Sequence, residues 1–298
     1  KHEVESLYVI YHGRIFSVTI KEILKVSRPR FWLYEAGTFA LIGAVAAHQG
    51  LTFFSDWRYW IFTFYFLIPA NILIYGINDI FDYETDKTNP KKVTYEALVP
   101  PNQQKPLWKW IVFSNAPFFF LVPLQVSLAV PFFAFVFFAT FYSAEPIRAK
   151  AKPFIDSLFS AGHYVATGVF GFYLAGGMGV PYTAVIAAMC WAVAMHAYSA
   201  VPDIESDIEA GLYTIAILIG QKKTLYFCWF LYLLSAYLVF GQLPLVAVIG
   251  AVVFSLLMIL SLRTKSPESL FQIYTYFPYI NVAVGTLLSI SLLVQNLR

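Results

Sequence analysis

The chain has 298 residues, of which 59% are hydrophobic and only 12% are charged, with a net charge of +3. Soluble domains carry roughly 25% charged residues, so this composition excludes a water-soluble protein. Pro and Gly stand at ordinary levels and apolar stretches recur along almost the whole length, which excludes disorder and predicts one membrane-embedded domain over residues 1–298.

A membrane-spanning helix needs about 20 apolar residues. The apolar stretches are continuous and do not alternate with a period of two, which favours helices over a β-barrel. The sequence therefore predicts an all-α membrane protein with nine transmembrane helices. Their expected bounds are Phe31–Leu51, Tyr59–Phe81, Leu107–Pro123, Val126–Tyr142, Phe154–Leu174, Tyr182–Val201, Leu225–Phe240, Leu245–Leu262 and Phe271–Leu293.

The basic residues are distributed unevenly between the two ends of these predicted spans. All lysines and arginines except Arg58 and Arg298 fall before the first span, in the loops that follow even-numbered spans or, for Lys109, at the very start of the span after such a loop. Because basic loops stay on the cytoplasmic side, we expect a cytoplasmic N-terminal segment at residues 1–30. The same rule places the long, charged loops at residues 82–106 and 202–224 in the cytoplasm, and there we expect the active site.

Two acidic motifs stand at the ends of even-numbered spans. Asn78, Asp82 and Asp86 are spaced by four residues, so a continuing helix would place their oxygens on one face. Asp203 and Asp207 are likewise one turn apart after the sixth span. Carboxylates at the same membrane depth repel one another unless cations lie between them. Mg²⁺ prefers hard oxygen ligands, so these five residues are the candidate metal ligands.

Carboxylates, a divalent cation and basic side chains together are typical of a diphosphate-binding site. An allylic diphosphate ionises when the charge of its leaving group is neutralised. The resulting carbocation must be kept from water, and the many Phe and Tyr of the predicted spans provide an apolar cavity whose aromatic faces stabilise a cation. The residues therefore predict transfer of a prenyl group inside the membrane.

The motifs as a set resemble the UbiA superfamily of intramembrane prenyltransferases. Besides the two acidic motifs, the similarity covers Ala210, Gly211, Thr214 and Gly220 and the segment 142–150, although Glu145 stands where the family often has a second Pro. The resemblance implies a helix bundle around a central cavity and Mg²⁺ dependence. It also implies catalytic roles for Asp82, Asp86, Asp203, Asp207 and Tyr142, and diphosphate contacts from Arg28, Lys91, Lys92, Arg148 and Lys150.

A narrower similarity concerns the acceptor. The segments 29–34, 69–71, 89–92 and 195–203 look like the lycopene elongase branch of that superfamily. This branch implies dimethylallyl diphosphate as donor and lycopene as acceptor in carotenoid biosynthesis. Such a long apolar acceptor would require a groove open to the lipid bilayer.

Three other functions stay open on the sequence alone. An aromatic prenyltransferase would use a ring such as 4-hydroxybenzoate as its acceptor. A cation-coupled membrane transporter would also use intramembrane acids, although such carriers tend to hold them near mid-membrane. A pigment-binding scaffold without turnover leaves both acidic motifs unexplained. No feature indicates a nucleic-acid partner.

Several polar residues lie inside or beside the predicted spans, where they are costly unless they face the bundle interior. Glu35, His196 and Tyr198 are candidates to line the cavity, whereas His163 is expected to be structural. Asp79 and Glu205 point away from the motif faces, so we expect them to be solvated or to lie behind the metal ligands. Asp156 is expected to cap the fifth helix.

Overall fold

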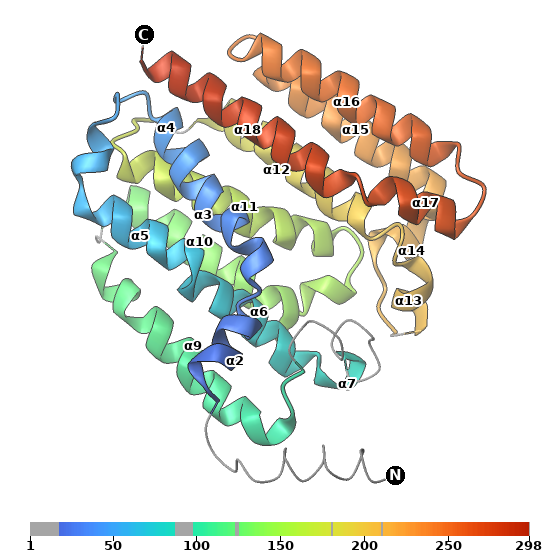
Figure 1. The fold of residues 1–298 in the computed structure, drawn as a ribbon, viewed down its shortest axis with the longest axis horizontal. Helices are drawn as coiled ribbons and strands as arrows, with labels where there is room; N and C mark the ends of the chain where they lie inside the picture. Colours follow the sequence, from blue (N-terminus) through green and yellow to red (C-terminus); the bar gives the residue numbers. More distant parts are fainter. Residues whose placement is uncertain (1–17, 87–97, 123–124, 180, 210, 298) are drawn as a thin grey trace.

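The computed structural model describes residues 18–86, 98–122, 125–179, 181–209 and 211–297. Within these residues every regular element is a helix and no strand occurs. The long helices pack side by side into one bundle, and the short helices α7 (Tyr83–Asp86), α13 (Ile204–Glu209) and α14 (Ile215–Ile219) lie together toward one end (Figure 1). Lys91, Lys92, Ala210 and Arg298, and residues 1–17 of the predicted N-terminal segment, lie outside the described residues.

Each predicted stretch coincides with a helical segment. The first corresponds to α3 (Trp32–Gly37), a π-helical segment η2 (Thr38–Gly43) and α4 (Ala44–Ala46), and the second to α5 (Trp57–Leu67) and α6 (Pro69–Phe81). The other long helices are α9 (Pro101–Leu121), α10 (Val126–Ser143), α11 (Ile155–Leu174), α12 (Tyr182–Ser199), α15 (Gln221–Val239), α16 (Pro244–Leu262) and α18 (Phe277–Asn296), the last preceded by α17 (Pro267–Tyr274). Short helices α2 (Ile20–Val26) and η1 (Pro29–Phe31) come first in the described chain.

Length and hydropathy identify 5 helical segments that can each cross a membrane in the described part of the chain. They are residues 57–81, 126–143, 182–199, 244–262 and 267–296. These segments make the chain an integral membrane protein, and the count of nine spans stays a prediction.

The second predicted stretch is broken near its middle. Pro69 has no N–H, so it cannot continue the backbone ladder of α5, and α6 begins at this residue. The side chain of Asn71 donates to the carbonyl oxygens of Phe66 at 2.9 Å and of Leu67 at 3.1 Å. A buried amide therefore satisfies backbone groups at the break, as a membrane interior requires.

Glycines allow the first helical run to approach α11 closely. A Cβ atom on Gly43 would lie 2.1 Å from the carbonyl oxygen of Gly168, and one on Gly171 would lie 2.4 Å from that of Phe39. Small residues at such crossings let helix backbones pack in direct contact, which is a main source of helix association in membranes.

We expect Gly43→Ala to lower the free energy of unfolding by about 2 kcal/mol, because its methyl group would force the backbones of η2 and α11 apart. Gly37→Ala is the matched control, since a Cβ there meets nothing within 4 Å. It should leave the stability unchanged or raise it slightly through helix propensity. Thermal melting of the purified protein in detergent compares the two, and equal melting temperatures would contradict the proposed contact.

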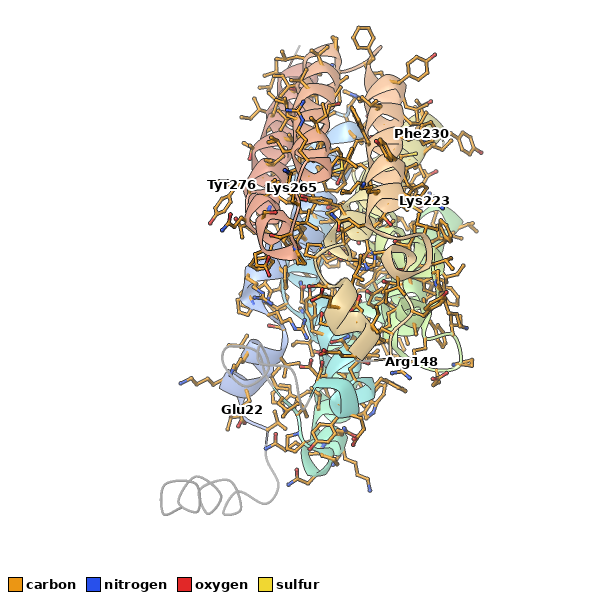
Figure 2. The ribbon with its side chains drawn as sticks, turned by 90° about the vertical axis from the view of Figure 1, so that its right-hand side faces the viewer. Glu22, Arg148, Lys223, Phe230, Lys265 and Tyr276 are labelled. Carbon is orange, nitrogen blue, oxygen red and sulfur yellow. The ribbon has the colours of Figure 1, made fainter. Side chains whose placement is uncertain are left out.

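Short acidic helices lie together at one end of the bundle. In Figure 1, α7 (Tyr83–Asp86) and α13 (Ile204–Glu209) lie at the end opposite the turn between α15 and α16. In Figure 2 the labelled charged residues Arg148, Lys223 and Lys265 all lie below Phe230 of α15, on the side of those acidic helices. These three cations therefore lie on the same side of Phe230 as the acidic helices, with Arg148 nearest to them.

Candidate active site

The first acidic motif keeps its helical spacing although the helix is interrupted. Helix α6 ends at Phe81, and Asp82 takes φ −105° and ψ 4° before α7 begins. The amide of Asp82 still donates to the carbonyl of Asn78 at 2.9 Å, and that of Asp86 to the carbonyl of Asp82 at 2.8 Å. Asn78, Asp82 and Asp86 thus follow one another at single-turn intervals, as the sequence predicts.

Arg28 and Asn78 connect the start of the first helical run to this motif. The Nη2 group of Arg28 donates to Asn78 Oδ1 at 3.1 Å and to Asp79 Oδ1 at 3.0 Å, and its guanidinium lies 4.5 Å from the ring centroid of Tyr75. Asn78 Nδ2 donates to Asp82 Oδ2 at 2.5 Å. Asp79 is only 2% exposed, so it is not solvated and forms an ion pair behind the motif.

The second motif differs from the expected continuous helix. Helix α12 ends at Ser199 rather than Val201, because Val201 precedes Pro202 and that position disfavours helical backbone. Helix α13 then carries the motif, and the amide of Asp207 donates to the carbonyl of Asp203 at 2.8 Å. His196 and Asp203 therefore do not lie on one continuous helix.

The basic segment after α10 brings a buried lysine between the two motifs. Lys150, in the short helix η4 (Ala149–Ala151), is 8% exposed and forms an ion pair with Asp82. Arg148 precedes η4 in the left-handed conformation, at φ 43°, and its buried Nε has no partner among the described residues.

Lys150 acts electrostatically on a carboxylate of each acidic motif. Burial raises the pKa of the Asp82 carboxyl, and Lys150 opposes that rise. Burial, and then the neighbouring charge of Asp203, raise the pKa of Asp207 to about 6, again with Lys150 opposing. A single ammonium group within reach of both carboxylates means that residues far apart in the chain converge on one region.

The donor chemistry of this region fits Mg²⁺. No three His, Cys, Asp or Glu side chains in the described chain gather closely enough for an all-protein metal cage. Mg²⁺ is usually bound by one or two carboxylates, with waters and substrate phosphates completing its octahedron. Asp82 with Asp86, and Asp203 with Asp207, form two pairs of neighbouring carboxylates that provide such open sites.

A cavity of about 430 Å³ opens beside the first motif. Its lining runs from Arg28 and Asn78 at the acidic end to Phe277 and Asn281 of α18. The remaining lining residues are mostly aromatic or small: Phe31, Tyr34, Ile74, Tyr75, Ala139, Tyr142, Ser160, His163, Tyr164, Met195, His196, Ser199, Tyr274 and Pro278.

Tyr142 is held in this cavity by a relay of polar side chains. Its hydroxyl lies 2.9 Å from Nε2 of His196, whose Nδ1 lies 3.1 Å from Ser157 Oγ. Asp156 accepts from the amide of Ser157 at 2.6 Å and from that of Ile215 at 3.3 Å. Asp156 is the second residue of α11, whose N-cap is Phe154, so it is not the expected cap; it binds backbone N–H groups at the starts of α11 and of α14 (Ile215–Ile219).

Two of the predicted cavity residues lie elsewhere. Tyr198 is fully buried, and its hydroxyl lies 2.9 Å from Ser261 Oγ in the core between α12 and α16. Glu35 is 1% exposed and lies behind His163, which lines the cavity instead. The sequence also did not single out Tyr34, Tyr75 and Tyr164 as lining residues, because tyrosines are abundant throughout the apolar stretches.

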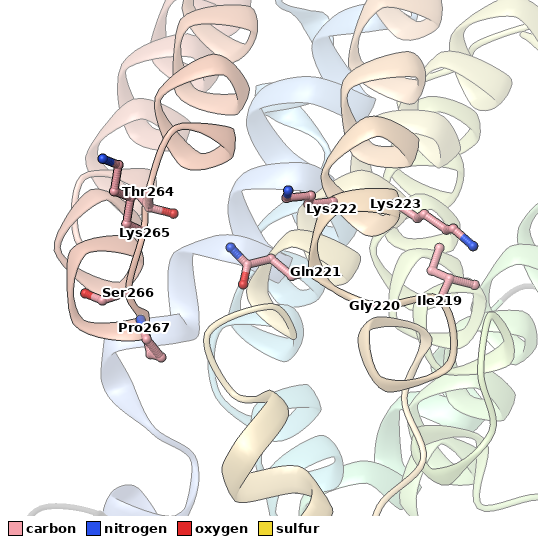
Figure 3. A pocket seen from close by; sticks show the side chains of 9 residues that line it. All are labelled: Ile219, Gly220, Gln221, Lys222, Lys223, Thr264, Lys265, Ser266 and Pro267. Atoms are coloured by element: carbon pink, nitrogen blue, oxygen red, sulfur yellow. The ribbon is translucent and has the colours of Figure 1, made fainter.

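A larger hollow of about 670 Å³ lies outside this region, between the start of α15 and the turn from α16 to α17 (Figure 3). Lysines, small polar residues and Pro267 line it. No residue of either acidic motif lines this hollow, whereas Asn78 of the first motif and Arg28 line the smaller cavity, so we assign the chemistry to the smaller cavity.

Comparison with known proteins agrees with this geometry. Residues 36–281 match the model of the UbiA prenyltransferase family. A lycopene elongase/hydratase of Haloarcula japonica is 37% identical, with 88% of each chain covered. One of Corynebacterium glutamicum is 32% identical, covering 92% of this chain and 97% of the relative. The structure of a UbiA homologue from Archaeoglobus fulgidus, described as bound to GPP and Mg²⁺, superposes on this chain with a TM-score of 0.69. The superposition covers 92% of this chain and 99% of that chain at 20% sequence identity, so it supports the fold alone.

The fold and the converging acidic motifs thus define an integral membrane enzyme that transfers prenyl groups. The chain belongs to the UbiA prenyltransferase family.

Proposed function

We propose that this protein transfers a prenyl group from dimethylallyl diphosphate to lycopene, in a Mg²⁺-dependent step of carotenoid biosynthesis. The observation that carries the proposal is that Asn78, which lines the aromatic cavity, is hydrogen-bonded to Asp82, whose ion-pair partner Lys150 also acts electrostatically on Asp207 of the second motif. The acceptor is inferred from the relatives in Haloarcula japonica and Corynebacterium glutamicum. The donor is suggested by the Archaeoglobus fulgidus homologue described as bound to DMAPP and Mg²⁺.

In this proposal Asn78, Asp82, Asp86, Asp203 and Asp207 hold the metal ions. Bound Mg²⁺ would neutralise the charge that develops on the leaving diphosphate. Arg28, Arg148 and Lys150 would bind the diphosphate oxygens, and Lys91 and Lys92 stay candidates for the same role. Tyr142, fixed by His196, would line the space where the allylic cation forms, and the surrounding aromatic rings would stabilise that cation and exclude water.

We also propose the orientation and span count. Nine spans would place residues 1–30 and the loops 82–106 and 202–224 in the cytoplasm, where dimethylallyl diphosphate is dissolved. The bias of basic residues toward these segments supports this orientation. The acceptor would enter from the bilayer.

The test uses membranes that contain the protein and lycopene, incubated with radiolabelled dimethylallyl diphosphate and Mg²⁺. Chromatography of the pigments should show label in a less mobile carotenoid, and EDTA should abolish it. Label that appears only with added 4-hydroxybenzoate would replace lycopene by an aromatic acceptor. Absence of labelled product with every acceptor would contradict the enzymatic proposal.

A further inference from the structure

The wall of the cavity holds a buried base, His163, backed by a buried acid, Glu35, and the prenyl transfer proposed above uses neither. Nδ1 of His163 lies 2.6 Å from Oε1 of Glu35, and the hydroxyl of Thr167 donates to Oε2 of Glu35 at 2.8 Å. Glu35 is 1% and His163 6% exposed. Replacing a buried acid–base pair by apolar residues of similar volume is often neutral or stabilising. The stability of the fold therefore does not explain why this cluster is present.

The two histidines that line the cavity are held differently. Both ring nitrogens of His196 have partners, Tyr142 and Ser157. His163 uses Nδ1 on Glu35, and no described residue bonds to its Nε2. A carboxylate that accepts from Nδ1–H fixes the tautomer with a lone pair on Nε2. His163 therefore presents the lone pair of Nε2 to the cavity, and its ring is oriented by Glu35.

Other polar groups accompany this base. Ser160 precedes His163 by one helical turn on α11 and lines the same cavity. Asn281 of α18 lines it too, is 7% exposed, and its Oδ1 atom has no partner among the described residues. A buried water molecule needs two to four polar partners, and an otherwise aromatic cavity offers them here.

The position of the cluster suits the end of the reaction rather than its start. His163 follows Asp156, at the start of α11, by seven residues and so lies about 10 Å further along that helix, with Glu35 beside it. The ring of Tyr164 lies 4.2 Å from that of His163, and Tyr34 lies 6.3 Å from Tyr164. A water molecule held there is separated from the ionising diphosphate. It is surrounded by aromatic rings, whose faces attract a cation.

We infer that His163, positioned by Glu35, is the general base that adds water to the product cation. This inference rests on the proposed function. The bond between the allylic carbon and the diphosphate oxygen breaks, and that carbon bonds to one end of the acceptor's terminal double bond. A water oxygen then bonds to the tertiary cation at the other end, and one of its protons passes to His163 Nε2. Donor, acceptor and water thus give a prenylated tertiary alcohol, diphosphate and a proton.

The test measures how the product divides between hydrated alcohol and dehydrated alkene, by mass spectrometry of pigments from lycopene-containing membranes in H₂¹⁸O. The wild type should form the alcohol with one ¹⁸O atom. His163→Phe alone would leave the Glu35 carboxylate buried without its partner, so Glu35→Leu/His163→Phe is the main variant. It should still form the new carbon–carbon bond and release diphosphate, while the alcohol-to-alkene ratio falls about 100-fold, the usual contribution of a general base.

Glu35→Gln retains His163 and should lower the ratio by less. Asn115→Asp alters a buried side chain on α9, outside this cavity, and serves as the control for general damage to the bundle. An unchanged ratio in the double variant, a wild type that forms only alkene, or loss of carbon–carbon bond formation in a folded double variant would each overturn the inference. A wild type that prenylates no lycopene at all would instead refute the proposed function.

Discussion

The Asp207→Asn variant is expected to lose about 1000-fold in turnover and yet to melt no lower than the wild type. Turnover falls because the proposed metal ligand loses its charge, and removing one preorganised electrostatic contact to a leaving group costs about this much. Stability is retained because the charged form of Asp207 is already unfavourable in the fold, where burial and Asp203 raise its pKa to about 6.

The pH dependence of stability separates this explanation from simple damage. The ordinary pKa of the Asp207 carboxyl is 3.8, so between pH 4 and pH 6 the folded protein binds more protons than the unfolded chain. The free energy of unfolding of the metal-free protein therefore falls as the pH rises through this range. Asp207→Asn should remove that fall and gain about 1 kcal/mol at pH 7, a value reduced for the partial exposure of the side chain.

Glu205→Gln on the same short helix is the matched control, since Glu205 is exposed. It should change neither turnover nor melting temperature. Turnover is followed as labelled carotenoid and stability as thermal melting in EDTA at pH 4, 6 and 7. A folded Asp207→Asn protein that keeps wild-type turnover would remove Asp207 from the metal site.

The helical elements could be predicted because each one coincides with a long apolar run. The breaks within them were harder to foresee. Pro69 is visible in the sequence, but whether a proline kinks a helix or ends it depends on whether a partner such as Asn71 satisfies the freed carbonyls. The π-helical turn at Thr38–Gly43 depends on close contact with α11 and has no local sequence signal.

The spacing of the acidic motifs identified the candidate ligands, because a four-residue repeat defines one side of a helix regardless of the tertiary fold. The direction in which other side chains point could not be predicted in helices that are apolar on every side. Tyr198 and His163 illustrate this limit, since Tyr198 faces the core and His163 the cavity. The pairs Arg28 with Asp79 and Glu35 with His163 join residues far apart in the chain, and one sequence does not reveal such contacts.

Lys150→Met is expected to lower both turnover and stability, the opposite stability result from Asp207→Asn. Lys150 is the buried partner of Asp82, so its removal leaves a carboxylate buried without its ion pair. Breaking a buried pair in this way costs about 3 kcal/mol or more. Turnover should fall about 100-fold as well, since one donor to the diphosphate is lost.

The two effects of Lys150 can be separated by a second substitution and by metal. Asp82→Leu/Lys150→Met removes both charges and should recover most of the stability without recovering turnover. Mg²⁺ together with a non-reactive thiolodiphosphate analogue of the donor should raise the melting temperature of Lys150→Met more than that of the wild type, because the bound cation would neutralise Asp82 in place of the lysine.

Lys152→Met is the control, because Lys152 directly follows η4 but is exposed. It should match the wild type in melting temperature and in turnover. If Lys150→Met also melts like the wild type in EDTA, the buried contact with Asp82 does not stabilise the fold. In that case Lys150 no longer links the two acidic motifs, and the argument for a shared diphosphate site would have to rest on Arg28 and Arg148 alone.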